Sequence, residues 1–385
     1  MLEPTTTAVV LTTIRDHEPL SRAEVAFRAH LSPSVVSTVT RSLIERGIVQ
    51  EVGTERAAMG RPSILLRVRP EFAYFVGLSL DGVHVTGTLV DLGGAVLADA
   101  RSALRERAPD SVLDACASLT TELLELPDRS IDPAAVAGIG IALSGLVDAA
   151  SGTCTQSTVM GWNDVPIGPL LERRSGRPVV AANDADAVAV GERLYGTANG
   201  YDDVAVLSIG QGIGAGIVTS GRLFQGTHGA AGELGHCTIE LDGPPCRCGK
   251  HGCLEAIASV PALLERARAR GVDAPDLEAL ESAAAAGDPV ATEELARAGS
   301  AIGLALSHLV NLFSPALLIV TGSGTKLGPV LRAAAHERYV QNVIPMLPSP
   351  PELRFRHEDG AVWARGAAAF ATESFLVKGG VMDDR

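Results

Sequence analysis

The sequence predicts an α/β protein with a small helical segment at its N-terminus and two mixed α/β lobes after it. Three patterns support this prediction. Over residues 9–49 the apolar residues recur at helical spacing, and two short turns interrupt them. From Tyr74 onward short strand and helix patterns alternate, which is typical of mixed α/β domains. A second series of the same kind opens at Val204. The chain therefore divides into a head and two lobes.

Length and composition agree with this division. The chain has 385 residues, of which 46% are hydrophobic, so it can bury more than one core. We expect a head on residues 1–70, a first lobe on residues 71–195 and a second lobe on residues 196–360. A last helix, over about residues 361–375, is expected to pack back on the first lobe.

The sequence gives no sign of secretion or of a membrane span. Its first residues lack a basic segment followed by a long apolar run, so no signal peptide is expected. The most apolar stretch, residues 301–320, is interrupted by polar residues and by Pro315, which indicates a buried helix and strand. Six cysteines, four of them close together, fit a reducing compartment better than a disulfide scaffold. We therefore expect a cytoplasmic protein with no membrane partner.

Capping residues mark two helices of the head. Ser21, with Glu24 three residues later, forms a capping box, which predicts a helix over residues 22–29. Ser32, followed by a proline, supplies an N-cap and a first-turn residue for the next helix, over residues 33–46. The two helices are separated by a short turn, as in a helix-turn-helix.

The helix predicted over residues 33–46 has an apolar face and a polar face. Its apolar face is formed by Val36, Val39 and Leu43. Its polar face carries small hydroxylated side chains and one arginine: Ser34, Ser37, Thr38 and Arg41. Such residues suit contacts to phosphates and base edges in the major groove of DNA. A solvated surface is the commoner reason for a polar face on a lone helix, but the helix-turn-helix spacing favours DNA here.

Two strands after this helix predict a wing. They are expected over residues 48–52 and residues 64–68, with Arg56 and Arg61 at the tip and return of the connection. A Gly-Arg-Pro tripeptide like the one around Arg61 can lay an arginine into a narrow minor groove, although many loops contain one. Residues 1–70 hold nine arginines, no lysine and seven acidic residues, a net charge of +2, whereas the whole chain carries −13. A slightly basic head on an acidic body is compatible with DNA binding by the head alone.

One histidine and three cysteines lie close together in the second lobe: His236, Cys246, Cys248 and Cys253. One imidazole and three thiolates satisfy a tetrahedral zinc ion and leave no position for a catalytic water, so we expect structural zinc. Unrelated surface cysteines are the ordinary alternative, which the close spacing disfavours. Two acids bracket the set, Glu233 and Glu255, where a stiffened loop would hold their carboxylates toward a polar ligand.

The same stretch resembles a known family. Glu-x-Gly-His at residues 233–236, followed by Cys-x-Cys-Gly-x-x-Gly-Cys-x-Glu at residues 246–255, is similar to the double signature of the ROK family. This family contains sugar-responsive repressors and sugar kinases. The head, including residues 20–26, resembles the winged helix of the family's repressors, which its kinases lack. The resemblance covers nearly the whole chain and implies that the two lobes adopt an actin-like, hexokinase-like ATPase fold.

The resemblance also locates two glycine hairpins that hold phosphates in the family's kinases. The first reads Asp-x-Gly-Gly-Thr in the kinases and Ser-Leu-Asp-Gly-Val at residues 79–83 here, so Asp81 would direct a carboxylate toward the phosphates. The second hairpin, residues 210–214, keeps its glycines but has Gln211 where a threonine is usual. Tight turns alone would explain those glycines. We therefore expect ATP binding to be lost.

On the sugar side, Asn183 and Asp184 resemble the family's Asn-Asp-Ala-Asn stretch, although Asp186 replaces the second asparagine. The aspartate is the general base of the kinases, and a carboxylate also accepts hydrogen bonds from sugar hydroxyls, so Asp184 would be a vestigial base that binds. The resemblance implies a monosaccharide held by five residues: Asn183, Asp184, Glu233, His236 and Glu255. It also implies that His236 directs one ring nitrogen to zinc and the other to the sugar.

Together these observations predict a sugar-responsive, DNA-binding transcriptional regulator, expected to be a repressor, that catalyses no reaction. It would bind operator DNA through residues 1–70 as a homodimer or higher homo-oligomer, and a monosaccharide effector would change the geometry of the heads. A ROK-type sugar kinase with ATP-dependent activity is one alternative. A constitutive DNA-binding protein whose body only dimerises is another. The sequence leaves open which sugar binds.

Overall fold

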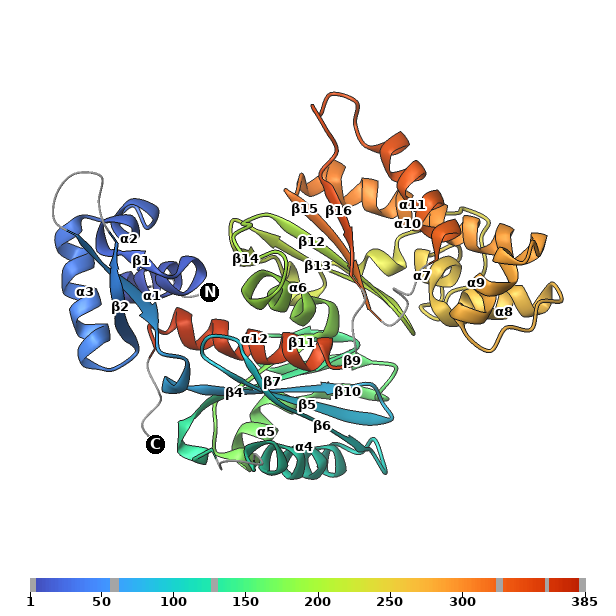
Figure 1. Cartoon of the computed structure of the whole chain (residues 1–385). Helices are drawn as coiled ribbons and strands as arrows, with labels where there is room; N and C mark the ends of the chain where they lie inside the picture. Colours follow the sequence, from blue (N-terminus) through green and yellow to red (C-terminus); the bar gives the residue numbers. More distant parts are fainter. Residues whose placement is uncertain (1–4, 56–61, 126–130, 323–327, 357–359, 381–385) are drawn as a thin grey trace. The chain divides into compact units, whose positions relative to one another are not determined.

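The N-terminal segment folds as a winged helix-turn-helix, as predicted. The computed structural model describes residues 5–55, 62–125, 131–322, 328–356 and 360–380. Its first elements are the helices α1 (Thr6–His17), α2 (Arg22–Arg28) and α3 (Pro33–Glu45) and the strands β1 (Leu20–Ser21), β2 (Val49–Glu55) and β3 (Ser63–Val68). The strands form an antiparallel sheet in the order β1-β3-β2, and the three helices lie beside it (Figure 1).

The predicted caps define the helices of the head. The Ser21 N–H donates to Glu24 Oε2 at 2.8 Å, and the Ser21 hydroxyl accepts from the Glu24 N–H at 3.3 Å, which completes the capping box. Ser32 caps α3 by accepting from the Val35 N–H at 3.4 Å. Just beyond α3, Gly47 has a φ of 76°, a left-handed conformation that glycine adopts without strain. Local chemistry therefore sets where these helices begin and end.

The chain forms two compact units, residues 1–200 with residues 363–385, and residues 201–362. After the head in the sequence, the first unit contains a five-stranded sheet in the order β11-β7-β4-β5-β6. Its strands are β4 (Tyr74–Leu80), β5 (His84–Asp91), β6 (Val96–Ala103), β7 (Val136–Leu143) and β11 (Val179–Asn183). The first three strands pair antiparallel, and β7 and β11 run parallel to β4.

Helices cover both faces of this sheet (Figure 1). Helices α4 (Pro109–Leu124) and α5 (Ile167–Ser175) lie on one face, and α12 (Val362–Val377) lies on the other with α6 (Asp184–Tyr195). A small antiparallel sheet, β8 (Leu146–Asp148), β9 (Thr153–Ser157) and β10 (Trp162–Val165), follows β7.

Glycines allow α12 to approach the sheet at backbone distance. A Cβ added to Gly77 on β4 would collide with the Ala364 carbonyl of α12, and one added to Gly140 on β7 would collide with the Ala367 carbonyl. On the opposite side of α12, a Cβ on Gly366 would lie 2.5 Å from the carbonyl oxygen of Ala187 on α6. Helix α12 is therefore clamped between the sheet and α6, with little room to shift alone.

The second unit repeats the plan of the first lobe. Its sheet has the order β14-β13-β12-β15-β16, with β12 and β13 antiparallel and β15 and β16 parallel to β12. The strands are β12 (Val204–Ile209), β13 (Ile213–Thr219), β14 (Arg222–Leu223), β15 (Leu317–Thr321) and β16 (Glu352–Phe355). The helices are α7 (Leu254–Ala258), α8 (Val260–Ala269), α9 (Leu277–Ala285), α10 (Pro289–Phe313) and α11 (Pro329–Asn342). Two lobes of this topology match the predicted actin-like, hexokinase-like fold.

Several elements were not predicted. Helix α6 begins at the Asn-Asp stretch that is predicted to bind sugar, and α11, β16 and the small β8–β10 sheet carry no clear sequence pattern. Residues 187–190 of α6 are all buried, so this helix lacks the polar stripe that makes a periodic pattern. Within the described ranges, no helix combines the length and apolarity that crossing a membrane requires.

Candidate metal centre and binding sites

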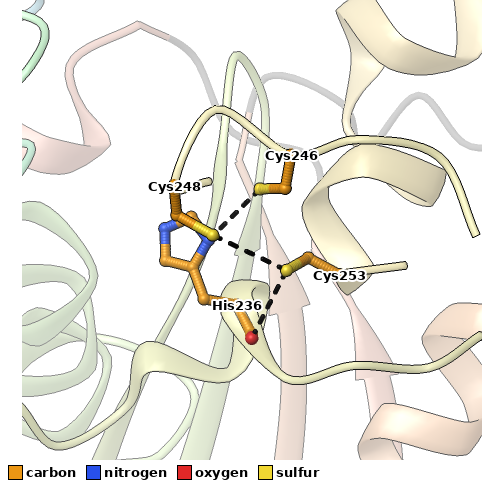
Figure 2. Close-up of side chains that lie close together, drawn as sticks. All are labelled: His236, Cys246, Cys248 and Cys253. Atoms are coloured by element: carbon orange, nitrogen blue, oxygen red, sulfur yellow. Dashed lines mark hydrogen bonds between the residues drawn. The ribbon is translucent and has the colours of Figure 1, made fainter. Parts of the chain in front are cut away.

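Four potential metal ligands come together in the second unit, as Figure 2 shows: His236, Cys246, Cys248 and Cys253. Their ligand atoms all lie within 4.8 Å of one another. The Cys246 Sγ lies 3.6 Å from His236 Nδ1, and the Cys248 Sγ lies 3.7 Å from the Cys253 Sγ. A tetrahedral zinc ion with bonds of about 2.3 Å to sulfur and about 2.1 Å to nitrogen separates its ligand atoms by about 3.6–3.8 Å. The donor set and its spacing therefore fit a tetrahedral metal.

Glycines and short backbone bonds shape the loop that carries the cysteines. The Cys246 N–H donates to the Lys250 carbonyl at 2.8 Å, and the Gly249 N–H donates to the Cys246 carbonyl at 2.9 Å. Gly249 and Gly252 have φ values of 90° and 66°, which glycine alone adopts freely. A Cβ on Gly252 would also collide with the carbonyl of Glu240. These residues fold the loop into a tight turn that brings the three sulfurs close together.

The two ring nitrogens of His236 have different surroundings. Nδ1 faces the sulfur cluster, and Nε2 lies 3.8 Å from Oε2 of Glu233. Burial raises the pKa of the Glu233 carboxyl, against the opposing effect of His236. At 3.8 Å the His236 Nε2 and the Glu233 Oε2 lie beyond hydrogen-bond distance, so Glu233 does not hold the imidazole by a hydrogen bond.

Arg247, which no motif marked, ties Glu255 to the cysteine loop. Its Nε lies 2.7 Å from Oε1 of Glu255, and its Nη2 donates to Oε2 at 2.9 Å. Oε2 also accepts from the Ile213 N–H, at the start of β13, at 3.1 Å. Gly212 leaves room for this pair, because a Cβ there would lie 2.6 Å from Oε2 and 2.8 Å from Nη2. Both oxygens of the Glu255 carboxylate are therefore bonded. Because Glu255 is only 5% exposed, these charge-assisted bonds are shielded from water.

An ion-pair network around the buried Glu294 supports the short helix α7, which carries Glu255 in its first turn. Arg266 donates to two carbonyls near the end of α7, at 3.0 and 2.6 Å, and to Oε2 of Glu294 at 2.9 Å. Arg270 donates to the other oxygen of Glu294 at 2.9 Å. Burial alone would raise the pKa of Glu294, but the bonds from both arginines outweigh it and lower that pKa. Helix α7 is therefore anchored at both ends.

Asn183 and Asp184 lie in the first unit, at the N-terminus of α6. Asn183 is the N-cap: its Oδ1 accepts from the Ala185 N–H at 2.8 Å, and its Nδ2 donates to the Gly145 carbonyl at 2.9 Å. The half-buried Asp184 also accepts from the Ala185 N–H, at 2.8 Å, and Asp186, two residues further along, is buried. A helix N-terminus favours such carboxylates. Glu233, His236 and Glu255 are brought together in the second unit.

Asp81 lies in the turn between β4 and β5 and caps its backbone. Its Oδ1 accepts from the N–H groups of Val83 and His84 at 2.8 and 2.6 Å, and its Oδ2 lies 3.2 Å from Arg101 Nη2. Burial alone would raise the pKa of Asp81, but the bonds from the Val83 and His84 N–H groups, together with the nearby His84 side chain, outweigh it and lower that pKa. An ionised carboxylate therefore stabilises the first glycine hairpin.

The polar face of α3 is open to solvent. Ser34, Thr38 and Arg41 are exposed, and Ser37 is half-buried. The Thr38 hydroxyl donates to the Ser34 carbonyl at 3.1 Å, which leaves its oxygen free to accept. The predicted wing residues Arg56 and Arg61 lie outside the described residues.

Arg22, another residue that the motifs did not mark, joins α2 to α3 and to the wing. Its Nε donates to the hydroxyl of the buried Thr40 on α3 at 3.2 Å, and its Nη2 donates to Glu51 on β2 at 3.0 Å. These bonds fix α3 relative to the rest of the head, which a recognition helix needs in order to read one register of DNA.

Comparisons with known proteins agree with this architecture. A profile of the ROK family matches residues 75–374, and a profile of the MarR family matches residues 5–51. The xylose repressor of Bacillus spizizenii is 28% identical to the chain over 374 residues, which cover 96% of this chain and 95% of that protein.

Two solved structures are similar to the chain, one over nearly its whole length and one over about three quarters of it. The crystal structure of a ROK family transcriptional regulator, a homologue of the E. coli MLC protein, is 30% identical and has a TM-score of 0.83, covering 97% of this chain and 96% of the other. A ROK family glucokinase from Streptomyces griseus, solved with glucose and AMPPNP, is 27% identical with a TM-score of 0.66, covering 77% of this chain and 99% of the kinase. The protein is a member of the ROK family, with a MarR-type winged helix ahead of the ROK body.

Proposed function

We propose that the protein is a transcriptional repressor that binds operator DNA with its head and responds to a monosaccharide bound by its body. The observation that carries this proposal is the exposed hydroxyl-and-arginine face of α3 on a winged helix joined to a ROK body. The likeness to the ROK transcriptional regulator extends over 97% of the chain, head included, whereas the likeness to the glucokinase covers 77%.

In this proposal residues 1–70 are the DNA-binding domain. The first lobe spans residues 71–195, completed by residues 361–375, and the second spans residues 196–360. Four residues of α3 contact the major groove: Ser34, Ser37, Thr38 and Arg41. Arg56 and Arg61 of the wing contact the adjacent minor groove. A homodimer or higher homo-oligomer would place two heads on a two-fold operator.

The effector would be a monosaccharide held by Asn183, Asp184, Glu233, His236 and Glu255. Carboxylates, an amide and an imidazole supply the acceptors and donors that sugar hydroxyls require. The metal would be zinc, held by His236, Cys246, Cys248 and Cys253, and it would supply structure rather than chemistry. With four protein ligands it has no open position. The sugar named in the xylose repressor differs from the glucose of the solved kinase, so likeness to these proteins does not identify the sugar.

We propose further that the protein catalyses no phosphoryl transfer and that Asp184 is a vestigial base. The support is the carboxylate of Asp81, ionised and bonded into the first glycine hairpin, where it would repel a nucleotide's phosphates. A ROK-type sugar kinase with residual ATP-dependent activity is the competing function. Its support is the glucokinase likeness and the presence of an aspartate at residue 184.

One pair of assays tests the proposal. A DNA duplex selected by the protein from a random library is titrated with and without d-xylose, d-glucose or N-acetyl-d-glucosamine, and the same sugars are incubated with ATP and magnesium. We expect one sugar to weaken DNA binding and no sugar phosphate to form. DNA affinity that no sugar alters would contradict the repressor proposal, and ATP-dependent sugar phosphorylation would establish the kinase.

A further inference from the structure

Helix α6 joins the proposed effector residues to the DNA-binding head within one compact unit. Its N-terminus carries Asn183 and Asp184, and its last residue is Tyr195. Twelve residues of α-helix span about 18 Å. Most of the helix is buried, so a displacement at one end is transmitted to the other with little bending.

At its C-terminal end, α6 contacts the last turn of α1 in the head. The guanidinium of Arg15 lies over the ring of Tyr195, 4.6 Å from its centroid. The Arg15 side chain is only 3% exposed, and its Nη1 donates to Asp16 Oδ1 at 3.0 Å. Arg193, two residues earlier on α6, lies 3.9 Å from the other carboxylate oxygen of Asp16. A buried arginine is costly unless its partners hold it, so α1 and α6 are tied at this point by charge as well as by packing.

Tyr195 also connects α6 to α12. Its hydroxyl donates to Thr372 Oγ1 at 2.6 Å, and burial raises the pKa of Tyr195 to about 12, which keeps this donor protonated. Gly191 and Gly366 bring the two helices to backbone contact, because a Cβ on Gly191 would lie 3.0 Å from the Gly366 Cα. The two helices therefore move as one body.

The end of α12 reaches the proposed recognition helix. Arg46, the C-cap of α3, donates to the carbonyls of Gly379 and Gly380 at 3.4 and 2.6 Å. Both glycines have positive φ values, 75° and 71°, which turn these carbonyls back toward the head. The head is thus held at α1 by Tyr195 and at α3 by the residues that follow α12.

We propose that α6 and α12 form a lever that carries effector binding to the head, with the Arg15–Tyr195 contact as its coupling point. The inference rests on the proposed function, since it takes Asn183 and Asp184 as effector residues. A ligand shifts an equilibrium only through unequal affinity for two states. An effector that prefers one position of α6 would therefore favour one position of α1 and α3. Small helix translations of this kind are a common form of switching.

The test measures a coupling factor, the ratio of DNA affinities without and with sugar, on the full chain. The wild type is first measured with d-xylose, d-glucose and N-acetyl-d-glucosamine, and the sugar that changes DNA affinity is kept. Arg15→Met keeps length and apolar contact but removes the cation. We expect its sugar affinity to stay within about twofold of wild type and its coupling factor to fall by about tenfold.

Arg332→Met is the matched control. It removes another arginine–aromatic contact, 5.3 Å from the ring centroid of Phe355, within the second unit. We expect its coupling factor to equal that of the wild type. Full coupling in Arg15→Met, or an equal loss in Arg332→Met, would overturn the lever. A wild type whose DNA affinity no sugar alters would instead overturn the proposed function, so the two failures are distinguishable.

Hydrogen exchange on the wild-type chain keeps the proposal testable if Arg15→Met does not fold. Adding the active sugar should change the rate of amide hydrogen exchange by at least twofold in residues 10–17 of α1 and in the C-terminal turn of α12. A sugar that weakens DNA binding while leaving exchange in both segments unchanged would overturn the proposal.

Discussion

Arg247 and Glu255 form a two-point ion pair across the cysteine loop, with N–O distances of 2.7 and 2.9 Å. Arg247 lies between two of the four clustered ligands, and Glu255 lies two residues after the last of them. Any ion that closes the loop would therefore also set the place of the guanidinium and, through it, of the carboxylate. The Ile213 N–H extends the same chain of bonds to the second glycine hairpin.

Replacing Arg247 with alanine should weaken sugar binding and leave the metal bound. Glu255 would keep its charge but lose the partner that orients it. A hydrogen bond to a charged group contributes about 1.5–3 kcal/mol, and because Arg247 is 45% exposed we expect the lower end, about a tenfold fall in affinity. Calorimetric titration measures the affinity, and elemental analysis measures the metal. Arg247→Lys keeps the positive charge but cannot bond both carboxylate oxygens as a guanidinium does, so it should recover only part of the lost sugar affinity. Wild-type affinity in Arg247→Ala would contradict this role.

Replacing Cys246 with serine should remove the metal and the sugar response together. The wild type should hold about one zinc per chain after chelator washing, and Cys246→Ser much less, since structural zinc prefers four protein ligands. Cys237→Ser is the control, because Cys237 is exposed and lies outside the cluster although it follows His236. Its metal content should match the wild type. A chelator-washed wild type without tightly held metal would exclude the metal site.

Replacing Arg41 with alanine should weaken DNA binding without affecting sugar binding. One arginine that contacts a base edge or phosphate contributes about 1–3 kcal/mol, so we expect at least a fivefold loss. Arg173→Ala, an exposed arginine on α5 of the first lobe, is the control and should bind DNA as the wild type does. If Arg61 enters a minor groove, Arg61→Ala should cost most on A·T-rich sites. Sequence-independent, equal losses for Arg41→Ala and Arg61→Ala in a site selection would argue against that division.

Replacing Asp184 with asparagine should weaken sugar binding and leave DNA affinity without sugar unchanged. Asparagine can keep the 2.8 Å bond from the Ala185 N–H, because its amide oxygen accepts equally, so helix α6 should remain capped. The loss of a charged acceptor is expected to cost about 1.5–3 kcal/mol of sugar affinity. Titration of the sugar and of the DNA separates these effects. ATP-dependent phosphorylation that disappears in Asp184→Asn would show that the aspartate still serves as a base.

Replacing Gly140 with alanine should destabilise the first unit, and the same change at Gly138 should not. On strand β7, a Cβ at residue 140 collides with the Ala367 carbonyl of α12, whereas one at residue 138 meets its nearest neighbour at 3.7 Å. Overpacking of this kind costs about 1–3 kcal/mol. Thermal unfolding of both variants measures the difference. Equal stability of the two would contradict the close packing of α12 on the sheet.

Short-range signals in the sequence predicted the head and the cysteine loop. Ser21 and Glu24 form their capping box within one helical turn, and Ser32 caps α3 in the same way. The four clustered ligands lie within eighteen residues, so their spacing alone indicated that they meet. Such features depend on a few neighbouring residues and are therefore legible without the fold.

Contacts that depend on the closed fold were not predictable. Arg247 gave no signal beyond its charge, because its partner is defined only when the loop is folded. Helix α6 escaped prediction because burial on nearly every side removes the polar stripe. Its contacts to the head were equally hidden, because Arg15 and Asp16, which meet Tyr195 and Arg193, are far from α6 in the sequence.

The order in which the ribosome makes this chain bears on how the first unit is completed. Its sheet and head are synthesised early, but α12 follows the whole of residues 201–362. Until then the glycine-lined face that receives Ala364 and Ala367 has no cover, and Arg46 has no glycine carbonyls to bind. The second unit must therefore be translated before α12 and the glycines after it can contact the head. A chain that stops short of α12 would leave an apolar face of the sheet exposed to aggregation or proteolysis.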